Sequence, residues 1–255
     1  MQDPGARVAN PGTGAWRGLL ALSEKTMKLE QLKNQLVVSC QPVPGSPMDR
    51  QDIIVAMAGA AVAAGARALR IEGAGNVRAV VDAWPGTPVI GIVKRDLADS
   101  PVRITPYLQD VQDLIDAGAA VVAFDGTQRK RPVPMADLLK AVHAAGRMAM
   151  ADCSTLEDGL AAQALGCELI GTTLSGYTEE TADVPADGPN LGLVTRLAKA
   201  GALVVAEGRM RTASDAAAAL SAGAYTVTVG SAITRIEHIT EWFIAAMQQA
   251  TAGKA

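Results

Sequence analysis

The feature that most constrains the fold is a unit that recurs eight times between Gln35 and Met247. Each unit begins with a short run rich in Val, Ile, Leu and Ala, which ends in a polar residue and is followed by a helical pattern. The runs are continuously apolar rather than alternating, as is typical of parallel strands buried on both faces. The predicted strands are 36–39, 68–72, 89–93, 120–125, 148–152, 168–172, 203–207 and 225–229.

A helix is predicted after each strand, and a glycine follows most of these helices. A glycine at this position can adopt the left-handed conformation that closes a helix. The predicted helices are 52–64, 76–83, 106–117, 134–145, 155–165, 191–200, 213–222 and 237–247. The glycines that follow a helical pattern are Gly65, Gly118, Gly146, Gly166, Gly201 and Gly223.

Eight strand–helix units in 255 residues predict a single α/β domain, a closed (β/α)8 barrel of the TIM type. An open, doubly wound sheet is the alternative, but no G-x-G-x-x-G motif follows the first predicted strand. We expect the barrel domain to span 27–255. Residues 1–26 are rich in Gly, Pro and polar residues without any period, so we expect an extension outside the core that is disordered or was added for expression.

Composition excludes several classes of partner. A net charge of −3 and an aromatic content of 3% argue against nucleic acid, which needs basic fields and stacking rings. No apolar run is long enough to cross a membrane. Three cysteines without paired spacing are typical of a reducing compartment, so we expect a cytoplasmic protein. We expect the many small residues to let eight helices pack closely on the barrel.

The polar residues at the strand ends are the candidates for function, because active sites of such barrels lie where the carboxyl ends of the strands meet. For any single one of them, a structural salt bridge on the rim is the alternative. The candidates at these ends include Ser39, Gln41, Arg70, Glu72, Lys94, Asp125, Asp152, Thr173 and Glu207.

The loops after the seventh and eighth predicted strands are candidates for phosphate binding. Both carry a glycine directly after the strand, which lets backbone N–H groups approach an anion, and these loops are the usual phosphate site of this fold. We expect Gly208, Arg209, Gly230, Ser231 and Arg235 to bind the phosphate. The alternative is that the two glycines only form turns.

Lys94 and Glu207 are the candidates for acid–base chemistry. Lys94 follows an apolar strand, so burial and the nearby Arg70 or Arg95 should lower its pKa and make the neutral amine accessible. Such a lysine can remove a proton next to a carbonyl or form a Schiff base. An ion pair between Lys94 and a carboxylate, with a purely structural role, is the alternative.

A metal site is not expected. Asp125, Asp152 and Glu207 could supply oxygen ligands, but the chain has only two histidines and neither is placed with a second one.

Together these motifs resemble those of a known family, the bacterial N-acylglucosamine-6-phosphate 2-epimerases, also called N-acetylmannosamine-6-phosphate 2-epimerases. The resemblance covers about Met27 to Met247, and its most specific element is the string Gly-Thr-Thr-Leu-Ser-Gly-Tyr-Thr at 171–178. The other matching segments are 39–41, 69–71, 88–94, 124–127, 151–155, 206–209 and 229–235.

The resemblance implies a function and roles for individual residues. The family inverts C2 of N-acetylmannosamine 6-phosphate to give N-acetylglucosamine 6-phosphate in sialic acid and amino sugar catabolism, without a nicotinamide or pyridoxal cofactor. By position, Lys94 is similar to the catalytic acid–base and Glu207 to its partner. Gln41, Arg70 and Asp152 resemble substrate-binding residues, and Arg235 resembles a phosphate ligand.

Two residues of the family-specific string are also candidates for binding the substrate. We expect Thr173 and Tyr177, both in the family-specific string, to contact it. The chain departs from the family at Ser231, where a second glycine is frequent, and at Ile236, where proline often follows the arginine. Both departures lie in the predicted phosphate loop.

Two other functions are compatible with the residues alone: a class I aldolase that uses Lys94 as a Schiff base, and a phosphosugar-binding barrel without catalysis. We expect a homodimer, in which the eighth helix could serve as the interface or could simply cap the barrel.

Overall fold

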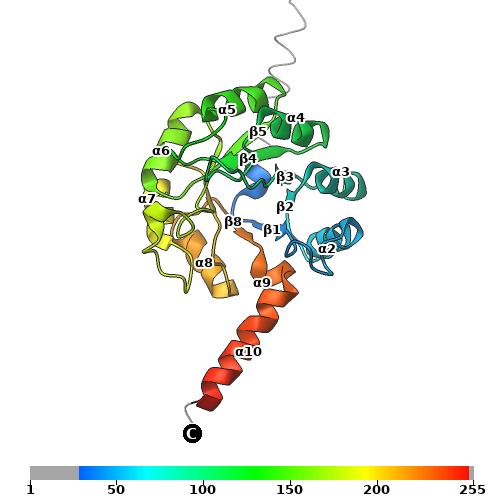
Figure 1. Ribbon diagram of the computed structural model, residues 1–255, viewed down its shortest axis with the longest axis vertical. Helices are drawn as coiled ribbons and strands as arrows, with labels where there is room; N and C mark the ends of the chain where they lie inside the picture. Colours follow the sequence, from blue (N-terminus) through cyan, green and yellow to red (C-terminus); the bar gives the residue numbers. More distant parts are fainter. Residues whose placement is uncertain (1–28, 253–255) are drawn as a thin grey trace, which may run out of the picture.

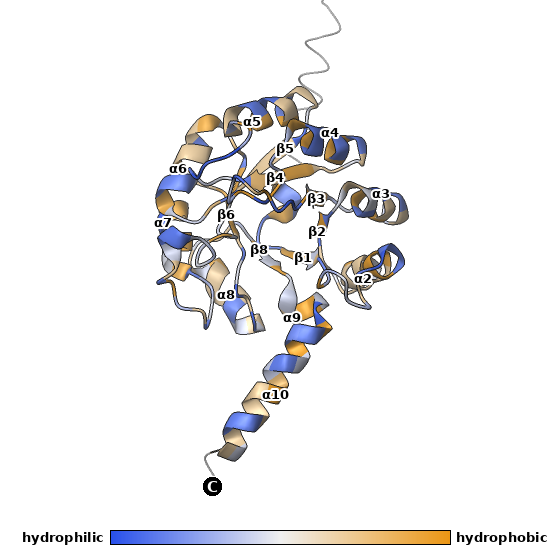
Figure 2. Ribbon diagram, viewed as in Figure 1, coloured by the Kyte–Doolittle hydropathy of each residue, from blue (hydrophilic) through white to orange (hydrophobic). Residues whose placement is uncertain are grey.

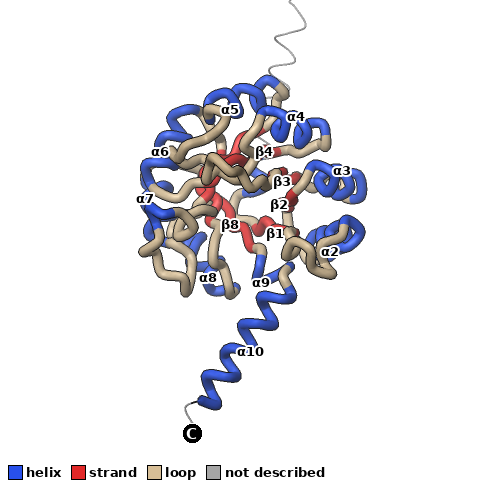
Figure 3. The backbone as a smooth tube through the Cα atoms, in the orientation of Figure 1, coloured by secondary structure: helices blue, strands red, loops and turns tan. Residues whose placement is uncertain are grey.

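The computed structural model describes residues 29–252, so the predicted extension 1–26 lies outside the described residues. Eight parallel strands close into a barrel in sequence order, from β1 through β8 and back to β1 (Figures 1 and 3). The strands are β1 (Leu36–Cys40), β2 (Ala68–Glu72), β3 (Val89–Ile92), β4 (Val121–Asp125), β5 (Met148–Asp152), β6 (Leu169–Gly171), β7 (Val204–Ala206) and β8 (Thr226–Val229). The closed barrel is confirmed, and the doubly wound alternative is wrong.

Helices surround the barrel and alternate with the strands along the chain (Figure 3). The surrounding helices are α2 (Gln51–Ala63), α3 (Ala74–Ala83), α4 (Leu108–Asp116), α5 (Met135–Ala144), α6 (Leu156–Leu165), α7 (Leu191–Lys199) and α8 (Ala213–Ser221). A short 3-10 helix, η1 (Glu179–Thr181), lies in the loop between β6 and α7. The six glycines predicted to end helices all have positive φ, from 69° at Gly146 to 108° at Gly166.

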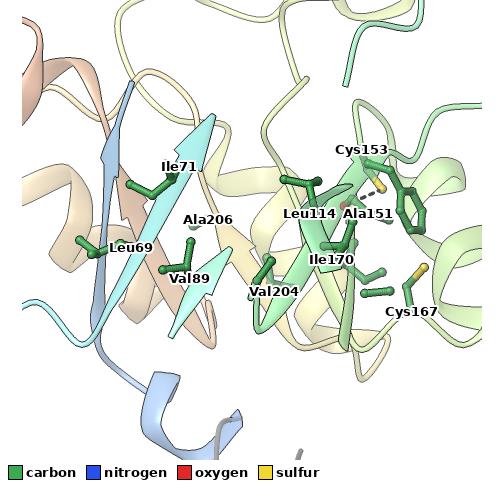
Figure 4. Close-up of a cluster of buried hydrophobic side chains, with 14 of the residues drawn as sticks. Leu69, Ile71, Val89, Leu114, Ala151, Cys153, Cys167, Ile170, Val204 and Ala206 are labelled. Atoms are coloured by element: carbon green, nitrogen blue, oxygen red, sulfur yellow. Dashed lines mark hydrogen bonds between the residues drawn. The ribbon is translucent and has the colours of Figure 1, made fainter. Parts of the chain in front are cut away.

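The apolar core has two layers, one inside the barrel and one between the strands and the helices. Side chains such as Ile90, Met150 and Val205 fill the interior. The outer layer includes Leu69, Val89 and Ile170 from the strands and Leu114 from α4 (Figure 4). Small residues allow this contact: a Cβ at Gly91 would lie 2.9 Å from Leu114 Cδ2. The interior layer fills the barrel, so a ligand can bind only outside this layer, at the carboxyl ends of the strands.

The N-terminal end of the barrel is closed by the segment that precedes β1. Residues 29–32 are helical, and Leu32 is fully buried in the interior cluster. The Tyr225 hydroxyl donates a 2.7 Å hydrogen bond to the Leu29 carbonyl. The polar residues that follow the strands therefore line the opposite end.

The last helix does not join the ring. A short helix, α9 (Ser231–Thr234), follows β8, and extended backbone at Arg235 separates it from α10 (Ile236–Ala252). None of the residues of α10 is buried, and the helix projects away from the barrel (Figure 1). It carries apolar and polar residues along its length (Figure 2). The expectation of eight helices packed on the barrel is therefore wrong, because the bend at Arg235 directs the last helix outward. None of the described helices is long and apolar enough to cross a membrane.

Candidate active site

The carboxyl ends of the strands form a mouth lined by polar side chains. The parallel register places Ser39 of β1 beside Arg70 of β2, and Asp152 of β5 beside the start of the loop that carries Thr173. Of the predicted residues, Gln41, Arg70, Lys94, Asp152, Thr173 and Glu207 are joined by hydrogen bonds or ion pairs in two groups.

The first group is built around Arg70, whose side chain is 1% exposed. Its guanidinium makes a bidentate contact with Asp152, at 2.7 Å from Nη2 to Oδ2 and 3.1 Å from Nη1 to Oδ1. The same Nη1 lies 3.0 Å from Glu207 Oε2. Burial opposes the charged form of Arg70, but the two carboxylates outweigh it and raise its pKa. Arg70 therefore stays charged and holds both carboxylates in place.

Glu207 belongs to this group, in which it shares the guanidinium of Arg70 with Asp152. Burial raises the pKa of Glu207 well above its usual range, and the charge of Asp152 adds to this effect. Arg70 and Lys94 act in the opposite direction. The backbone of Glu207 is fixed by Thr172, whose hydroxyl donates to its carbonyl at 3.0 Å and accepts from its N–H at 3.1 Å. Glu207 is thus a carboxyl group that can hold a proton near neutral pH.

The second group is built around Lys94. Its Nζ donates a 2.6 Å hydrogen bond to Gln41 Oε1, and its backbone N–H donates to Glu72 Oε1 at 3.2 Å. Gln41 is buried, and its amide N–H donates to the Ser39 hydroxyl at 2.8 Å. An ammonium group can only donate, so this arrangement turns the Gln41 oxygen toward Lys94.

The surroundings of Lys94 favour its neutral form. Lys94 as a residue is exposed at the mouth, although barrel atoms surround its amino group. Burial, followed by the charges of Arg70 and Arg235, lowers the pKa of Lys94 to about 8. The expected influence of Arg95 is not found, because its guanidinium pairs with the buried Asp110 at 2.6 Å. The alternative ion pair of Lys94 with Glu207 is also absent among the described residues.

Lys94 and Glu207, one from each group, lie on opposite sides of the barrel. Strands follow one another around the ring in sequence order, so β3 and β7 are four strands apart in a ring of eight. Lys94 follows β3 and Glu207 follows β7. A small molecule in the mouth would therefore have a potential base on one face and a potential acid on the other.

The predicted phosphate loops lie side by side, since β7 pairs with β8. Gly230 begins the turn into α9, and Thr234 at its end donates a 2.7 Å hydrogen bond to the Ser39 carbonyl. Arg235 Nε donates to the Gln41 carbonyl at 2.8 Å. Within residues 29–252 the Ser231 amide has no protein acceptor. These contacts tie the eighth loop to the strand that carries Gln41.

Arg209 is placed differently from Arg235. Its guanidinium donates to the carbonyls of Gly176, Val184 and Pro185, at 2.6, 2.9 and 2.7 Å. It also lies over the Tyr177 ring, 5.0 Å from the centroid. A Cβ at Gly176 would overlap this guanidinium, so the close contact requires glycine. The side chain of Arg209 thus clamps the loop between β6 and α7.

Tyr177 and Gly208 lie together at the rim. Tyr177 is 59% exposed, and a Cβ at Gly208 would lie 3.8 Å from its ring. The ring is therefore outside the two buried hydrogen-bonded groups.

Ser39 and Glu72 were predicted only as polar residues at strand ends, without a role of their own. The register of neighbouring strands could have paired Ser39 with Arg70, but not with the Gln41 side chain. Asp125 forms a separate cluster with Arg129 and Arg131, at 2.7 and 3.2 Å. In the described part of the chain, no group of three or more His, Cys, Asp or Glu side chains could hold a metal ion.

Comparison with known proteins identifies the family to which the chain is similar. The family described as "Putative N-acetylmannosamine-6-phosphate epimerase" matches residues 54–249. A protein named "Putative N-acetylmannosamine-6-phosphate 2-epimerase" from Edwardsiella ictaluri is 58% identical, over 86% of this chain and 91% of the relative. A protein of the same name from Shigella dysenteriae is 59% identical, over 84% and 92% of the two chains.

A solved structure gives the same result. It is described as the N-acetylmannosamine-6-phosphate 2-epimerase from Clostridium perfringens, and it shares 38% identity with a TM-score of 0.82, covering 86% of this chain and 95% of that chain. The family match, the identities and the shared barrel lead to one conclusion: this chain belongs to the N-acetylmannosamine-6-phosphate epimerase family.

Proposed function

We propose that the protein inverts C2 of N-acetylmannosamine 6-phosphate to give N-acetylglucosamine 6-phosphate, as a step of sialic acid and amino sugar catabolism. One observation carries the proposal: an amine with a lowered pKa and a carboxyl group with a raised pKa lie on opposite strands of one mouth. Groups whose protonation states are shifted in this way are typical of acid–base sites. Inversion at a carbon requires a proton to leave one face and another to arrive on the opposite face.

The chemistry begins with the open-chain sugar. Ring opening exposes the C1 aldehyde, which makes the neighbouring C2 proton acidic. Neutral Lys94 takes this proton, and the electron pair of the C–H bond moves into the carbonyl to give an enolate. Glu207 then donates a proton to the other face of C2. In the reverse reaction the two residues exchange roles. Only protons are transferred, so the step needs no redox partner.

The remaining residues bind and orient the sugar. Gln41, Asp152, Thr173 and Tyr177 face the mouth or its rim and are proposed to contact the sugar, together with Arg70. Arg70 also keeps the two carboxylates in place.

The 6-phosphate is proposed to bind at the seventh and eighth loops, through Gly208, Gly230, Ser231, Arg235 and the backbone of Arg209. Binding at the phosphate would orient C2 between Lys94 and Glu207.

Proton exchange in deuterated water tests the proposal. The product should gain deuterium at C2. In early turnover the recovered substrate should keep its hydrogen, because a proton removed on one face is not returned there by the second residue. Exchange into substrate and product alike would mean that one residue serves both faces. Absence of C2 exchange, or a borohydride-trapped adduct at Lys94, would exclude the proposed epimerisation.

We further propose that the protein is a homodimer that uses α10. Phe243 and Met247 on this helix are 69% and 68% exposed, and Ile244 lies beside them. Apolar residues on an unpacked helix are typical of an interface. Light scattering should give the mass of two chains, and Phe243→Glu with Met247→Glu should give the mass of one.

A cytoplasmic location is part of the proposal. Cys40, Cys153 and Cys167 are free and buried, as is typical of a reducing compartment. The location can be checked by fractionating cells that express the protein.

A further inference from the structure

Thr173 contacts both carboxylates of the mouth, through the same oxygen atoms that Arg70 contacts. Its Oγ1 lies 2.5 Å from Asp152 Oδ1 and 3.4 Å from Glu207 Oε2. Arg70 Nη1 lies 3.1 Å from the first oxygen and 3.0 Å from the second. The four side chains therefore form a closed ring, in which a hydroxyl and a guanidinium bridge the same two carboxylates.

The hydroxyl of Thr173 has one proton to donate. The 2.5 Å contact places this proton toward Asp152, since such short distances are typical of O–H···O⁻ hydrogen bonds. Only a lone pair of Oγ1 then faces Glu207 Oε2. An ionised Glu207 would set lone pair against lone pair, whereas a protonated Glu207 can donate its own O–H to Thr173.

Burial and the charge of Asp152 favour the protonated form of Glu207, whereas Arg70 and Lys94 oppose it. The charged groups that face it are Arg70 from β2, Lys94 from the end of β3 and Asp152 from β5. Arg70 donates to both oxygens of Asp152 but to only one oxygen of Glu207. Asp152 is therefore the better stabilised anion, and a proton shared by the two carboxylates resides on Glu207.

We propose that Thr173 is a positioning residue for Glu207, which accepts a hydrogen bond from the protonated carboxyl while it donates to Asp152. The inference rests on the proposed role of Glu207 as a proton donor, and it gives the Thr173 hydroxyl a task other than sugar binding. The bridge keeps the proton on Glu207 in the resting enzyme. In turnover the proton leaves Oε2 for C2, and the resulting carboxylate keeps its contact with Arg70.

The Thr173→Val variant tests the direction of this hydrogen bond, because valine keeps the shape and removes the hydroxyl. If Thr173 accepts from protonated Glu207, its loss lowers the pKa of Glu207 by about half to one pH unit. If Thr173 instead donates to ionised Glu207, its loss raises that pKa. The infrared band of the protonated carboxyl, assigned with Glu207→Gln and followed over pH, reports the change without any sugar.

Two further variants control the experiment. Thr173→Ser restores the hydroxyl and should restore the wild-type titration. Thr178→Val removes another buried hydroxyl from the same loop, which contacts Ser154 but neither Asp152 nor Glu207, and should leave the titration of Glu207 unchanged.

Turnover adds an independent measurement. We expect Thr173→Val to lower kcat about 10-fold and to raise KM by less, since the hydroxyl acts mainly on a proton donor and contributes only part of the sugar binding. An unchanged or raised pKa of Glu207, or a raised KM with unchanged kcat, would overturn the inference. A wild-type protein that shows the infrared titration but no C2 exchange would contradict the proposed function and leave the hydrogen bond itself established.

Discussion

The two sides of the mouth hold their ionisable groups in opposite surroundings. Lys94 is bonded to a neutral amide, and the nearby charges that lower its pKa are the cations Arg70 and Arg235. Glu207 lies among buried groups in which two carboxylates share one guanidinium. Each group is therefore pushed away from its ordinary charge. The barrel thus prepares a base and an acid by the same means, burial combined with a nearby like charge, which is that of Arg70 and Arg235 at Lys94 and that of Asp152 at Glu207.

The largest effect should come from Lys94→Ala. Removal of the base should lower C2 exchange about 10³- to 10⁴-fold. Among the described residues, no other amine at the end of β3 could take the place of Lys94. Exchange is measured by the loss of the C2 proton signal in deuterated water, and circular dichroism checks the fold. Lys140→Ala, on the exposed face of α5, is the matched control and should keep wild-type exchange. Full activity of Lys94→Ala would contradict the assignment of Lys94 as the base.

The next effect concerns stability. Asp152→Ala should lower the free energy of unfolding by about 3 kcal/mol, because it leaves a buried guanidinium with one carboxylate instead of two. Gln41→Ala removes a neutral partner on the other side and should cost only about 1 kcal/mol. Urea unfolding of both variants measures the difference. Equal losses would mean that the two sides do not differ as described.

Glu207→Gln should be slower but more stable above neutral pH. The folded-state pKa of Glu207 lies above its ordinary value of 4.5, so the folded protein holds a proton that the unfolded chain releases. Its contribution to stability therefore falls as the pH rises from 4.5 through the raised pKa. Glutamine does not titrate, so the variant should gain about 1 kcal/mol over wild type at about pH 8 and little at about pH 5. Urea unfolding at both pH values checks this, and a variant that is less stable at the higher pH would contradict it.

The smallest effect is a shift in the titration of Lys94. Arg235→Met removes one of the cations that lower its pKa, so this pKa should rise from about 8 by roughly half a pH unit. Less neutral amine is then present at a given pH. The rate at which an acetylating reagent modifies Lys94, followed by mass spectrometry across the pH range, measures the shift. A pKa that falls would mean that Arg235 acts on Lys94 mainly through its hydrogen bond to the Gln41 carbonyl.

The fold could be predicted almost completely from the sequence, because it depends on local signals that repeat. Continuous apolar runs place the strands to within one or two residues, and the glycines mark the helix ends. The exception is α10. An apolar stripe on a helix predicts that this face packs against another surface. It does not predict whether that surface is the barrel or something else. The bend at Arg235, which decides the direction of the helix, has no signal of its own.

The site could be predicted only as a set of positions. The rule that strand ends converge was enough to bring Gln41, Arg70, Lys94 and Glu207 together. This rule does not predict which side chains pair with one another, because pairing depends on the length of each side chain and on the direction in which it points. Arg209 shows this limit: it follows the same strand end as Glu207, but positive φ at both Gly208 and Arg209 turns its guanidinium to the loop.

The clamp made by Arg209 has a consequence for the kinetics of the loop. Its three acceptors lie at Gly176, Val184 and Pro185, so one side chain joins positions far apart in the same loop. The segment between them cannot detach at one end while the guanidinium keeps all its bonds. The loop therefore opens as one cooperative unit, and its amides should exchange with solvent at a common rate rather than fraying one by one.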